Sequence, residues 1–184
     1  MKIYTKKGDD GTTGLFYGGR VAKDDLAPEA YGSVDEAVSA LGIVRAGLDA
    51  ADPLAATILD RQRELFVVAA ELATDPANAD KLQDDVSRVT EGMVRRLEEE
   101  IDQIVSAVGM PTEFVVPGGT PAAAGLDVAR TVVRRAERRA VAVMERAVGH
   151  ESLAVPYLNR LADYLYMLAR AVEGEWTPSR KEET

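Results

Sequence analysis

Apolar residues recur every three or four positions along most of the chain after residue 27, and this spacing constrains the fold more than any other feature. It is the spacing of amphipathic α-helices, and no stretch in this part alternates Val, Ile or Thr with polar residues as a half-buried strand would. The pattern is clearest where the apolar positions are Val86, Val89, Met93, Leu97, Ile101, Ile104 and Val108. Because each amphipathic helix must bury its apolar stripe against its neighbours, we expect an all-α helical bundle.

Proline, glycine and polar stretches divide this pattern into five expected helices. They cover residues 28–47, 53–73, 86–108, 121–148 and 156–173. The fourth should begin with Thr120 as its cap and Pro121 in its first turn. The length of 184 residues favours a single domain. Within it we expect an N-terminal arm over 1–27, a bundle over 28–174 and a frayed tail over 175–184.

The absence of cysteine, together with a single histidine, excludes several kinds of chemistry. No disulfide, thiolate zinc site, iron–sulfur cluster or cysteine nucleophile can form, and one histidine cannot supply a three-histidine zinc site or a di-iron bundle site. We expect His150 itself on the surface, just after a helix end. Carboxylate, arginine, hydroxyl and backbone groups remain as candidates.

The chain carries 22 Lys and Arg against 31 Asp and Glu, and its net charge of −9 argues against nucleic-acid binding. Residues 130–139 are an exception, because five arginines and one glutamate occur there. This basic block favours a site for a small polyanion. The sequence shows neither a signal-peptide core nor a run of about 18 apolar residues, so we expect a cytoplasmic protein that does not enter a membrane.

The N-terminal arm is rich in glycine and in groups that bind phosphate. Residues 5–14 (TKKGDDGTTG) combine glycines, which allow close backbone approach, with hydroxyls and two ammonium groups. The segment lacks the Gly-Lys-Ser/Thr ending of a P-loop, and no expected strand leads from it directly into a helix. Composition alone leaves open both a phosphate cradle and a flexible arm.

The fourth expected helix carries charged residues beside its apolar stripe. Helical geometry places Arg130, Arg134 and Glu137 at the edge of that stripe. Arg135 and Arg139 point away from it and are expected to be solvated. An arginine that borders a core needs an anion nearby, because its charge is partly removed from water.

Acidic and amide groups on two other helices are candidate partners for these arginines. Asp35 stands next to a core position of the first helix, and a pair that serves stability alone is the alternative interpretation. On the fifth helix, Asn159 and Asp163 lie one turn apart. An asparagine at such a position is more often a cap or a satisfied core amide than a ligand.

Five short segments occur in a fixed order along the chain. They are residues 2–11 (KIYTKKGDDG), 31–36 (YGSVDE), 114–120 (FVVPGGT), 128–138 (VARTVVRRAER) and 158–164 (LNRLADY). Together they resemble the PduO-type ATP:cob(I)alamin adenosyltransferases, in the same order and over residues 2 to about 170. Agreement of five separate motifs in register makes this resemblance specific.

The resemblance implies a five-helix bundle assembled as a homotrimer, with active sites between neighbouring subunits. It implies transfer of the 5′-deoxyadenosyl group of ATP to the Co(I) of cob(I)alamin, with release of triphosphate. Mg²⁺ would accompany the nucleotide, and its ligands are not assigned. A B12-dependent mutase or a reductase is the partner expected for handover.

The resemblance also implies roles for individual residues. The ATP-binding set is Thr5, Lys6, Lys7, Gly8, Thr13, Gly14, Lys23, Arg134, Arg135, Glu137, Arg138 and Asn159. The corrinoid-binding set is Asp35, Phe114, Arg130 and Asp163. Arg130 would pair with Asp35 of the adjacent chain, and Phe114 would pack beneath the corrin. These three residues, Asp35, Phe114 and Arg130, are the expected catalytic residues.

Cob(I)alamin is itself a strong nucleophile, which fits a chain without cysteine and with one histidine. Catalysis then requires alignment of the substrates and stabilisation of charge on the leaving triphosphate, for which Lys6 and Arg134 are suited. Two other functions remain open. A small kinase would share the nucleotide loop but release ADP, and a non-catalytic helical oligomer would not bind ATP.

Overall fold

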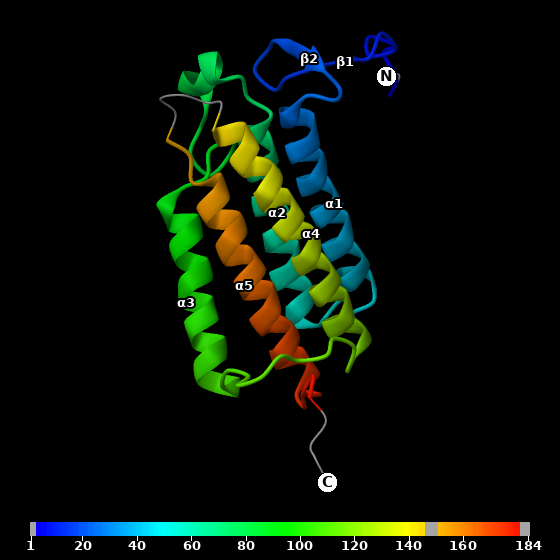
Figure 1. Cartoon of the computed structure of the whole chain (residues 1–184), viewed down its shortest axis with the longest axis vertical. Helices are drawn as coiled ribbons and strands as arrows, with labels where there is room; N and C mark the ends of the chain where they lie inside the picture. Colours follow the sequence, from blue (N-terminus) through cyan, green and yellow to red (C-terminus); the bar gives the residue numbers. More distant parts are fainter. Residues whose placement is uncertain (1–2, 146–150, 181–184) are drawn as a thin grey trace.

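The computed structural model describes residues 3–145 and 151–180, and within this part five α-helices form a bundle (Figure 1). The helices are α1 (Leu26–Ala46), α2 (Pro53–Leu72), α3 (Glu91–Val108), α4 (Pro121–Met144) and α5 (Ala154–Glu173), with a 3₁₀-helix η1 (Pro76–Lys81) after α2. The N-terminal arm holds an antiparallel pair of short strands, β1 (Thr12–Gly14) and β2 (Arg20–Ala22). The prediction of a helical fold is confirmed. None of the described helices combines the length and apolarity needed to span a bilayer.

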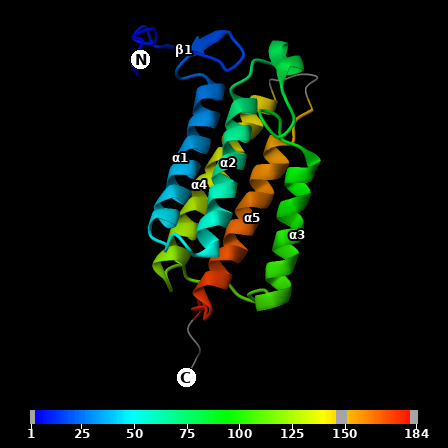
Figure 2. The same cartoon turned by 180° about the vertical axis from the view of Figure 1, so that it is seen from behind.

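Helix α4 lies at the centre of the packing. It contacts α1 on one side and α5 on the other, α2 packs against α1, and α3 joins the bundle through α5 (Figures 1 and 2). Helix α5 contributes the fully buried side chains of Tyr157, Leu158 and Leu161 to the core. The close approach of α1 to α4 depends on Gly125, because an added Cβ there would lie 2.6 Å from Cγ2 of Val44.

Most predicted helix boundaries differ from the observed ones by a few residues. Helix α1 begins at Leu26 rather than at the expected position 28, because the Asp25 carboxylate accepts a hydrogen bond from the backbone N–H of Ala27 at 3.4 Å and caps the helix. Helix α5 begins at Ala154 rather than at 156. Helix α4 is described to Met144, so its expected end at 148 and the surface position of His150 lie outside the described residues.

The predicted start of the third helix is wrong. Residues 86–88 form a turn in which their N–H groups donate to the Gln83 carbonyl, and Asp85 has a left-handed φ of 59°. The helix begins only at Glu91, where the hydroxyl of Thr90 accepts from the N–H of Met93 at 3.4 Å. The side chain of Val86 is consequently 63% exposed, although its spacing matches the apolar stripe.

The two ends of the chain also differ from expectation. The arm contains a hairpin in which Thr13 faces Val21, a pairing that its glycine-rich sequence did not indicate. Residues 175–180 are not frayed. The Val116 N–H donates to the carbonyl of Thr177 at 2.8 Å, and the Ser179 N–H donates to the carbonyl of Phe114 at 2.7 Å. Residues 177–179 are therefore held against the loop between α3 and α4.

The position of α3 predicts different stability losses for two residues of the same apolar stripe. Met93→Ala should lower the free energy of unfolding by about 2–5 kcal/mol, because Met93 is buried. Val86→Ala should change it by less than about 0.5 kcal/mol, because the side chain is largely exposed. Urea unfolding of both variants, followed by circular dichroism, measures the difference. Equal losses would show that the helix extends back to residue 86.

Candidate active site

A cavity of about 500 Å³ lies between the α3–α4 loop and the facing sides of α4 and α5. Four residues predicted for the site line it, because Phe114 comes from the loop, Arg130 and Arg134 from α4, and Asp163 from α5. The other lining residues are Met110, Pro111, Thr112, Glu113, Val115, Pro117, Asp127, Ala162 and Tyr166. The cavity thus combines an apolar wall with a charged rim.

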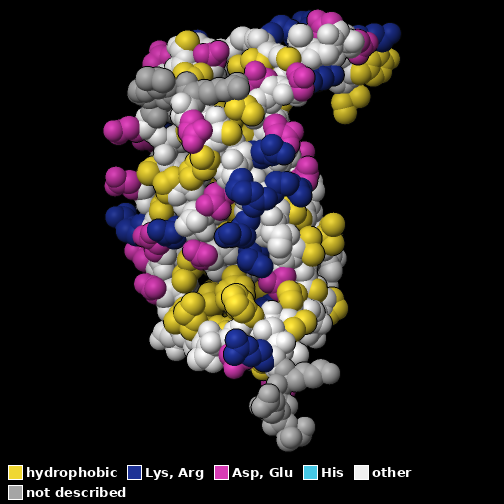
Figure 3. Space-filling model, viewed as in Figure 1, with side chains coloured by type: hydrophobic (Ala, Val, Ile, Leu, Met, Phe, Trp, Pro, Cys, Tyr) yellow, Lys and Arg dark blue, Asp and Glu magenta, His cyan; other side chains and the backbone are white. Residues whose placement is uncertain are grey.

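The phenylalanine of this wall is unusually accessible. The side chain of Phe114 is 85% exposed, compared with 55% for Phe16 and 60% for Phe66. In Figure 3, hydrophobic side chains gather near this end of the molecule, and Lys and Arg side chains gather above them along α4. An exposed aromatic ring beside a cavity favours contact with a ligand or partner.

A buried ionic network lies behind the cavity. Asp127 of α4 is bonded through Oδ2 to Nη2 of Arg170 at 2.5 Å, and its Oδ1 lies 3.7 Å from Nε of Arg130. Nη2 of Arg170 also lies 3.2 Å from Oε2 of Glu173. The guanidinium groups of Arg130 and Arg170 lie 5.7 Å and 5.2 Å from the ring centroid of Tyr166. Asp127 and Tyr166 therefore connect Arg130, which lines the cavity, to the buried Arg170.

Sequence reasoning missed Asp127 and Arg170. Both are charged residues that the bundle buries, with side chains 5% and 0% exposed. A buried charge needs a partner of opposite sign, and each of the two residues supplies it to the other. Neither residue lies in the periodic apolar stripe of its helix, so the spacing of apolar residues gave no signal for the pair.

The basic face of α4 continues above the cavity. Arg134 is more exposed than its predicted place at the edge of the stripe, and its carbonyl accepts a hydrogen bond from Nη1 of Arg138 at 3.0 Å. Glu137 and Asn159 come together across α4 and α5, because Nδ2 of Asn159 donates to Oε1 of Glu137 at 2.9 Å. Asn159 is a satisfied helix-interior amide, since Nη1 of Arg160 donates to its oxygen at 2.5 Å.

Arg135 and Arg139 lie on the surface as predicted, with side chains 42% and 48% exposed, but each also forms an ion pair. Arg135 is ion-paired with Glu36 of α1, and Nη2 of Arg139 lies 3.0 Å from Oε1 of Glu29. Both arginines therefore join α4 to α1. Asp35 is exposed on α1 and is not among the residues that line the cavity.

The predicted residues of the arm lie far from the cavity of the same chain. The arm is at one end of the bundle and the α3–α4 loop is at the other (Figures 1 and 2). Helix α4 has 24 residues, so the two ends are separated by about 36 Å at 1.5 Å per residue. Thr5, Lys6, Lys7, Gly8, Thr13, Gly14 and Lys23 are thus not brought together with Phe114 within one chain.

The arm nevertheless has a defined local structure. The backbone N–H of Lys23 donates to the Gly11 carbonyl at 2.9 Å, and a Cβ added at Gly8 would meet Nζ of Lys23 at 3.3 Å. The carboxylate of Asp10 accepts hydrogen bonds from the N–H and the hydroxyl of Thr12 at 2.9 and 2.8 Å. These bonds, the backbone bond first, lower the pKa of Asp10 below its ordinary value.

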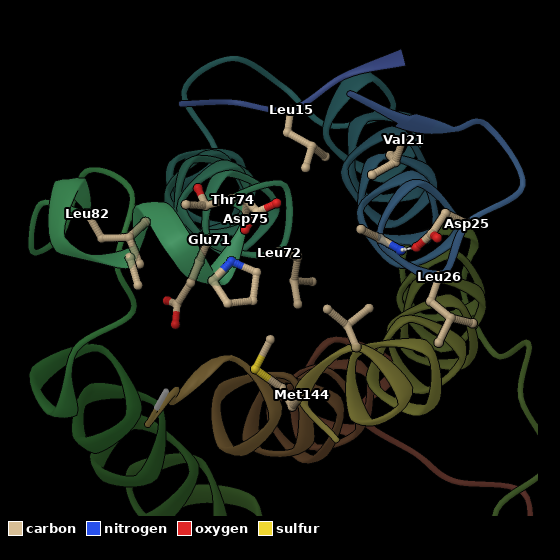
Figure 4. A pocket seen from close by; sticks show the side chains of 14 residues that line it. Leu15, Val21, Asp25, Leu26, Glu71, Leu72, Thr74, Asp75, Leu82 and Met144 are labelled. Atoms are coloured by element: carbon tan, nitrogen blue, oxygen red, sulfur yellow. Dashed lines mark hydrogen bonds between the residues drawn. The ribbon is translucent and has the colours of Figure 1, made fainter. Parts of the chain in front are cut away.

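A second cavity, of about 260 Å³, lies beneath the hairpin and holds none of the predicted site residues (Figure 4). Leu15 and Val21 point into it from the hairpin, and Leu72 lines it from the end of α2. The Phe16 N–H donates to the Ala73 carbonyl at 2.9 Å. Apolar contacts and this backbone bond therefore place the hairpin on the helix ends.

The fold and the cavity can now be compared with known proteins. The sequence pattern of the cobalamin adenosyltransferase family matches residues 3–172. The chain belongs to the cobalamin adenosyltransferase family. A corrinoid adenosyltransferase of Citrobacter freundii is 43% identical to this chain over 172 residues, which are 94% of this chain and 95% of that protein.

Two further relatives agree with membership of the cobalamin adenosyltransferase family. A corrinoid adenosyltransferase of Bacillus subtilis is 42% identical over 175 residues, which cover 94% of this chain and 86% of that protein. A solved variant of a PduO-type ATP:corrinoid adenosyltransferase from Lactobacillus reuteri, complexed with cobalamin and ATP, has a TM-score of 0.82 and 34% identity. That alignment covers 94% of this chain and 91% of the Lactobacillus chain.

The lowered pKa of Asp10 predicts how the hairpin responds to acid. An ionised Asp10 stabilises the folded arm above the unfolded pKa, and this contribution is lost as the pH falls through the lowered folded pKa. Thr12→Val removes the hydroxyl donor, so the Asp10 titration should move up toward the ordinary carboxyl value. Carboxyl carbon shifts measured by NMR against pH give both midpoints. Thr13→Val is the matched control, and an equal shift in that variant would refute the assignment to Thr12.

Proposed function

We propose that this chain transfers the 5′-deoxyadenosyl group of ATP to the Co(I) of cob(I)alamin and releases triphosphate. One observation carries the proposal: in a member of the cobalamin adenosyltransferase family, Phe114, Arg130, Arg134 and Asp163 line a single cavity. Its apolar wall suits the face of a corrin ring, and its arginines suit a polyphosphate. The whole chain acts as one domain, with the arm over 1–27, the bundle over 28–174 and the tail over 175–184.

The corrin binds against the loop side of the cavity. The exposed ring of Phe114 lies beneath the macrocycle and keeps water and a lower axial ligand away from cobalt. Asp163 and Arg130 on the rim offer an acceptor and a donor to the amide groups around the corrin. Cobalt without a lower ligand is easier to reduce, so this wall favours formation of Co(I).

The nucleotide lies between the arm and the basic face of α4. The arm contributes Thr5, Lys6, Lys7, Gly8, Thr13, Gly14 and Lys23, and α4 and α5 contribute Arg134, Arg135, Glu137, Arg138 and Asn159. Arg135 must exchange its bond with Glu36 for one with phosphate to take part. Mg²⁺ accompanies the triphosphate, because this ion takes many of its ligands from phosphate oxygens and water. No group of three or more acidic or histidine side chains suited to a metal occurs in residues 3–145 and 151–180.

The chemical step requires no base from the protein. The electron pair of Co(I) attacks C5′ of ATP, the Co–C bond forms, and the C5′–O bond breaks with its electrons leaving on triphosphate. Cobalt becomes formally Co(III). Lys6 and Arg134 stabilise the charge that develops on the leaving group, and the two binding surfaces align cobalt with C5′.

The distance between the arm and Phe114 supports an assembly of several chains. Because about 36 Å separates the two ends of α4, an arm cannot reach the Phe114 wall of its own chain, and the arm that closes the site over both substrates comes from a neighbouring copy in a homotrimer. Arg130 then pairs with Asp35 of the adjacent chain, which is exposed on α1 in the single chain. The partner for handover is a B12-dependent mutase or a reductase.

Arg134→Ala should lower kcat/KM for ATP by about tenfold to hundredfold, because one charge-assisted hydrogen bond to phosphate contributes roughly 1.5–3 kcal/mol. The assay follows the absorbance change when chemically reduced cobalamin and ATP form adenosylcobalamin, and it also measures triphosphate. Arg63→Ala, an exposed arginine on α2 that pairs with Asp60, is the control. Formation of ADP in place of triphosphate, or unchanged kinetics in Arg134→Ala, would contradict the proposal.

The proposed pair between Arg130 and Asp35 makes a prediction about assembly. Asp35→Ala should weaken the trimer and lower activity, because loss of one partner of a buried pair costs about 3–5 kcal/mol. Light scattering over a dilution series measures the mass, with Asp60→Ala as the control for an exposed aspartate. A monomeric mass for the unmodified protein would rule out this arrangement.

A further inference from the structure

The loop that carries Phe114 is held in place through its backbone. Because the Phe114 side chain is 85% exposed, packing within this chain does little to fix the ring. The segment instead pairs with the tail: the Ser179 N–H donates to the Phe114 carbonyl at 2.7 Å, and the Val116 N–H donates to the Thr177 carbonyl at 2.8 Å. The depth of the ring in the cavity therefore depends on where these backbone anchors lie.

A second anchor holds the other end of the loop. The Gly119 N–H donates to Oε1 of Glu173 at 2.6 Å. A Cβ added at Gly119 would lie 2.3 Å from the same oxygen, so the approach is too close for any residue with a side chain. Glu173 is itself immobilised, since its side chain is 1% exposed and is ion-paired with the fully buried Arg170.

The tail and Glu173 are connected to each other as well. Indole Nε1 of Trp176 donates to the Arg170 carbonyl at 3.0 Å, at the point where α5 ends. The residue that fixes Glu173 thus also fixes the start of the tail. Both anchors of the Phe114 loop trace back to the last turn of α5.

We propose that Glu173 and the tail residues 176–179 are positioning elements that set the place of Phe114 beneath the corrin. The inference rests on the proposed function, in which the ring keeps the lower face of cobalt free. Neither Glu173 nor any of residues 176–179 is among the residues that line the cavity. They act through the backbone of residues 114–119.

Two variants remove one anchor each. Glu173→Ala removes the acceptor for Gly119, and Ser179→Pro removes the N–H that bonds to Phe114. Glu175→Ala, an exposed carboxylate two residues after Glu173, and Ser179→Ala, which keeps the N–H, are the matched controls. Glu173→Gln keeps an acceptor oxygen for Gly119 and should partly restore the activity lost in Glu173→Ala.

Each variant is assayed for adenosylation from cob(II)alamin with a reductant and, separately, from chemically reduced cob(I)alamin. Glu173→Ala and Ser179→Pro should lower kcat from cob(II)alamin about tenfold or more, because a misplacement of about 1 Å in an active site can cost as much as about a hundredfold. The loss should be smaller from cob(I)alamin, and KM for ATP should stay within about twofold. Electron paramagnetic resonance of bound cob(II)alamin with ATP should show less of the four-coordinate form.

A double variant separates positioning from a general loss of stability. If Glu173 acts through Phe114, then Glu173→Ala should add little to the loss already caused by Phe114→Ala. Multiplied losses in the double variant, or parent-like turnover and spectra in both Glu173→Ala and Ser179→Pro, would overturn the inference while the proposed function stands. Should Glu173→Ala fail to fold, Ser179→Pro decides. Parent-like behaviour of Phe114→Ala would overturn the role of the ring and this inference together.

Discussion

The buried ion pair between Asp127 and Arg170 determines how α4 and α5 lie against each other, and the cavity depends on that register. The guanidinium of Arg170 is fully buried, and it lies 2.5 Å from Asp127 and 3.2 Å from Glu173. An arrangement that separated Arg170 from Asp127 would remove the shorter of these contacts, and loss of one partner of a buried pair costs about 3–5 kcal/mol. The register that satisfies Arg170 also brings Arg130 and Arg134 of α4 opposite Asp163 of α5. The arrangement of the charged residues that line the cavity thus depends on the buried pair of Asp127 and Arg170.

The pair of Asp127 and Arg170 is also connected by hydrogen bonds and an ion pair to the loop between α3 and α4 and to the residues after α5. Arg170 is ion-paired with Glu173, whose carboxylate accepts a hydrogen bond from the Gly119 N–H. The backbone carbonyl of Arg170 accepts a hydrogen bond from the indole N–H of Trp176. An apolar pair of similar volume would stabilise the helices as well, but it could not orient a carboxylate toward a backbone donor. The ionic contacts therefore fix the orientation of Glu173, whereas the leucines of α5 bury apolar surface and stabilise the packing of the helices.

The sequence was sufficient for the helices because their apolar period is a local property of each segment. It was insufficient where structure depends on a turn or on distant pairing. Val86 fits the stripe of α3 by spacing, yet residues 86–88 form a turn onto the Gln83 carbonyl, and the helix begins only at Glu91. The pairing of Ser179 with Phe114 leaves no periodic trace, because only backbone atoms take part. The hairpin of the arm could not be predicted either, because its strands are also joined through backbone atoms.

The residues of the candidate site also divide into those that the sequence could predict and those that it could not. Helical geometry correctly placed Arg130 near the core, and family resemblance indicated Phe114 and Asp163, which line the same cavity. The ion pair of Arg135 could not be predicted, because its partner, Glu36, lies on another helix, and helical geometry within one segment cannot show such a contact. The pair of Asp127 and Arg170 could not be predicted, because the two residues lie on different helices and the periodicity of one helix does not show a contact with another.

The length of α4 has a genetic consequence. Under the proposed assembly, each working site takes its arm from one copy of the chain and its corrin wall from another. A copy damaged only in the arm and a copy damaged only in the wall are each inactive alone. In an equal mixture, roughly a quarter of the sites would still join an intact arm to an intact wall. Two defective alleles, expressed together, would therefore complement each other.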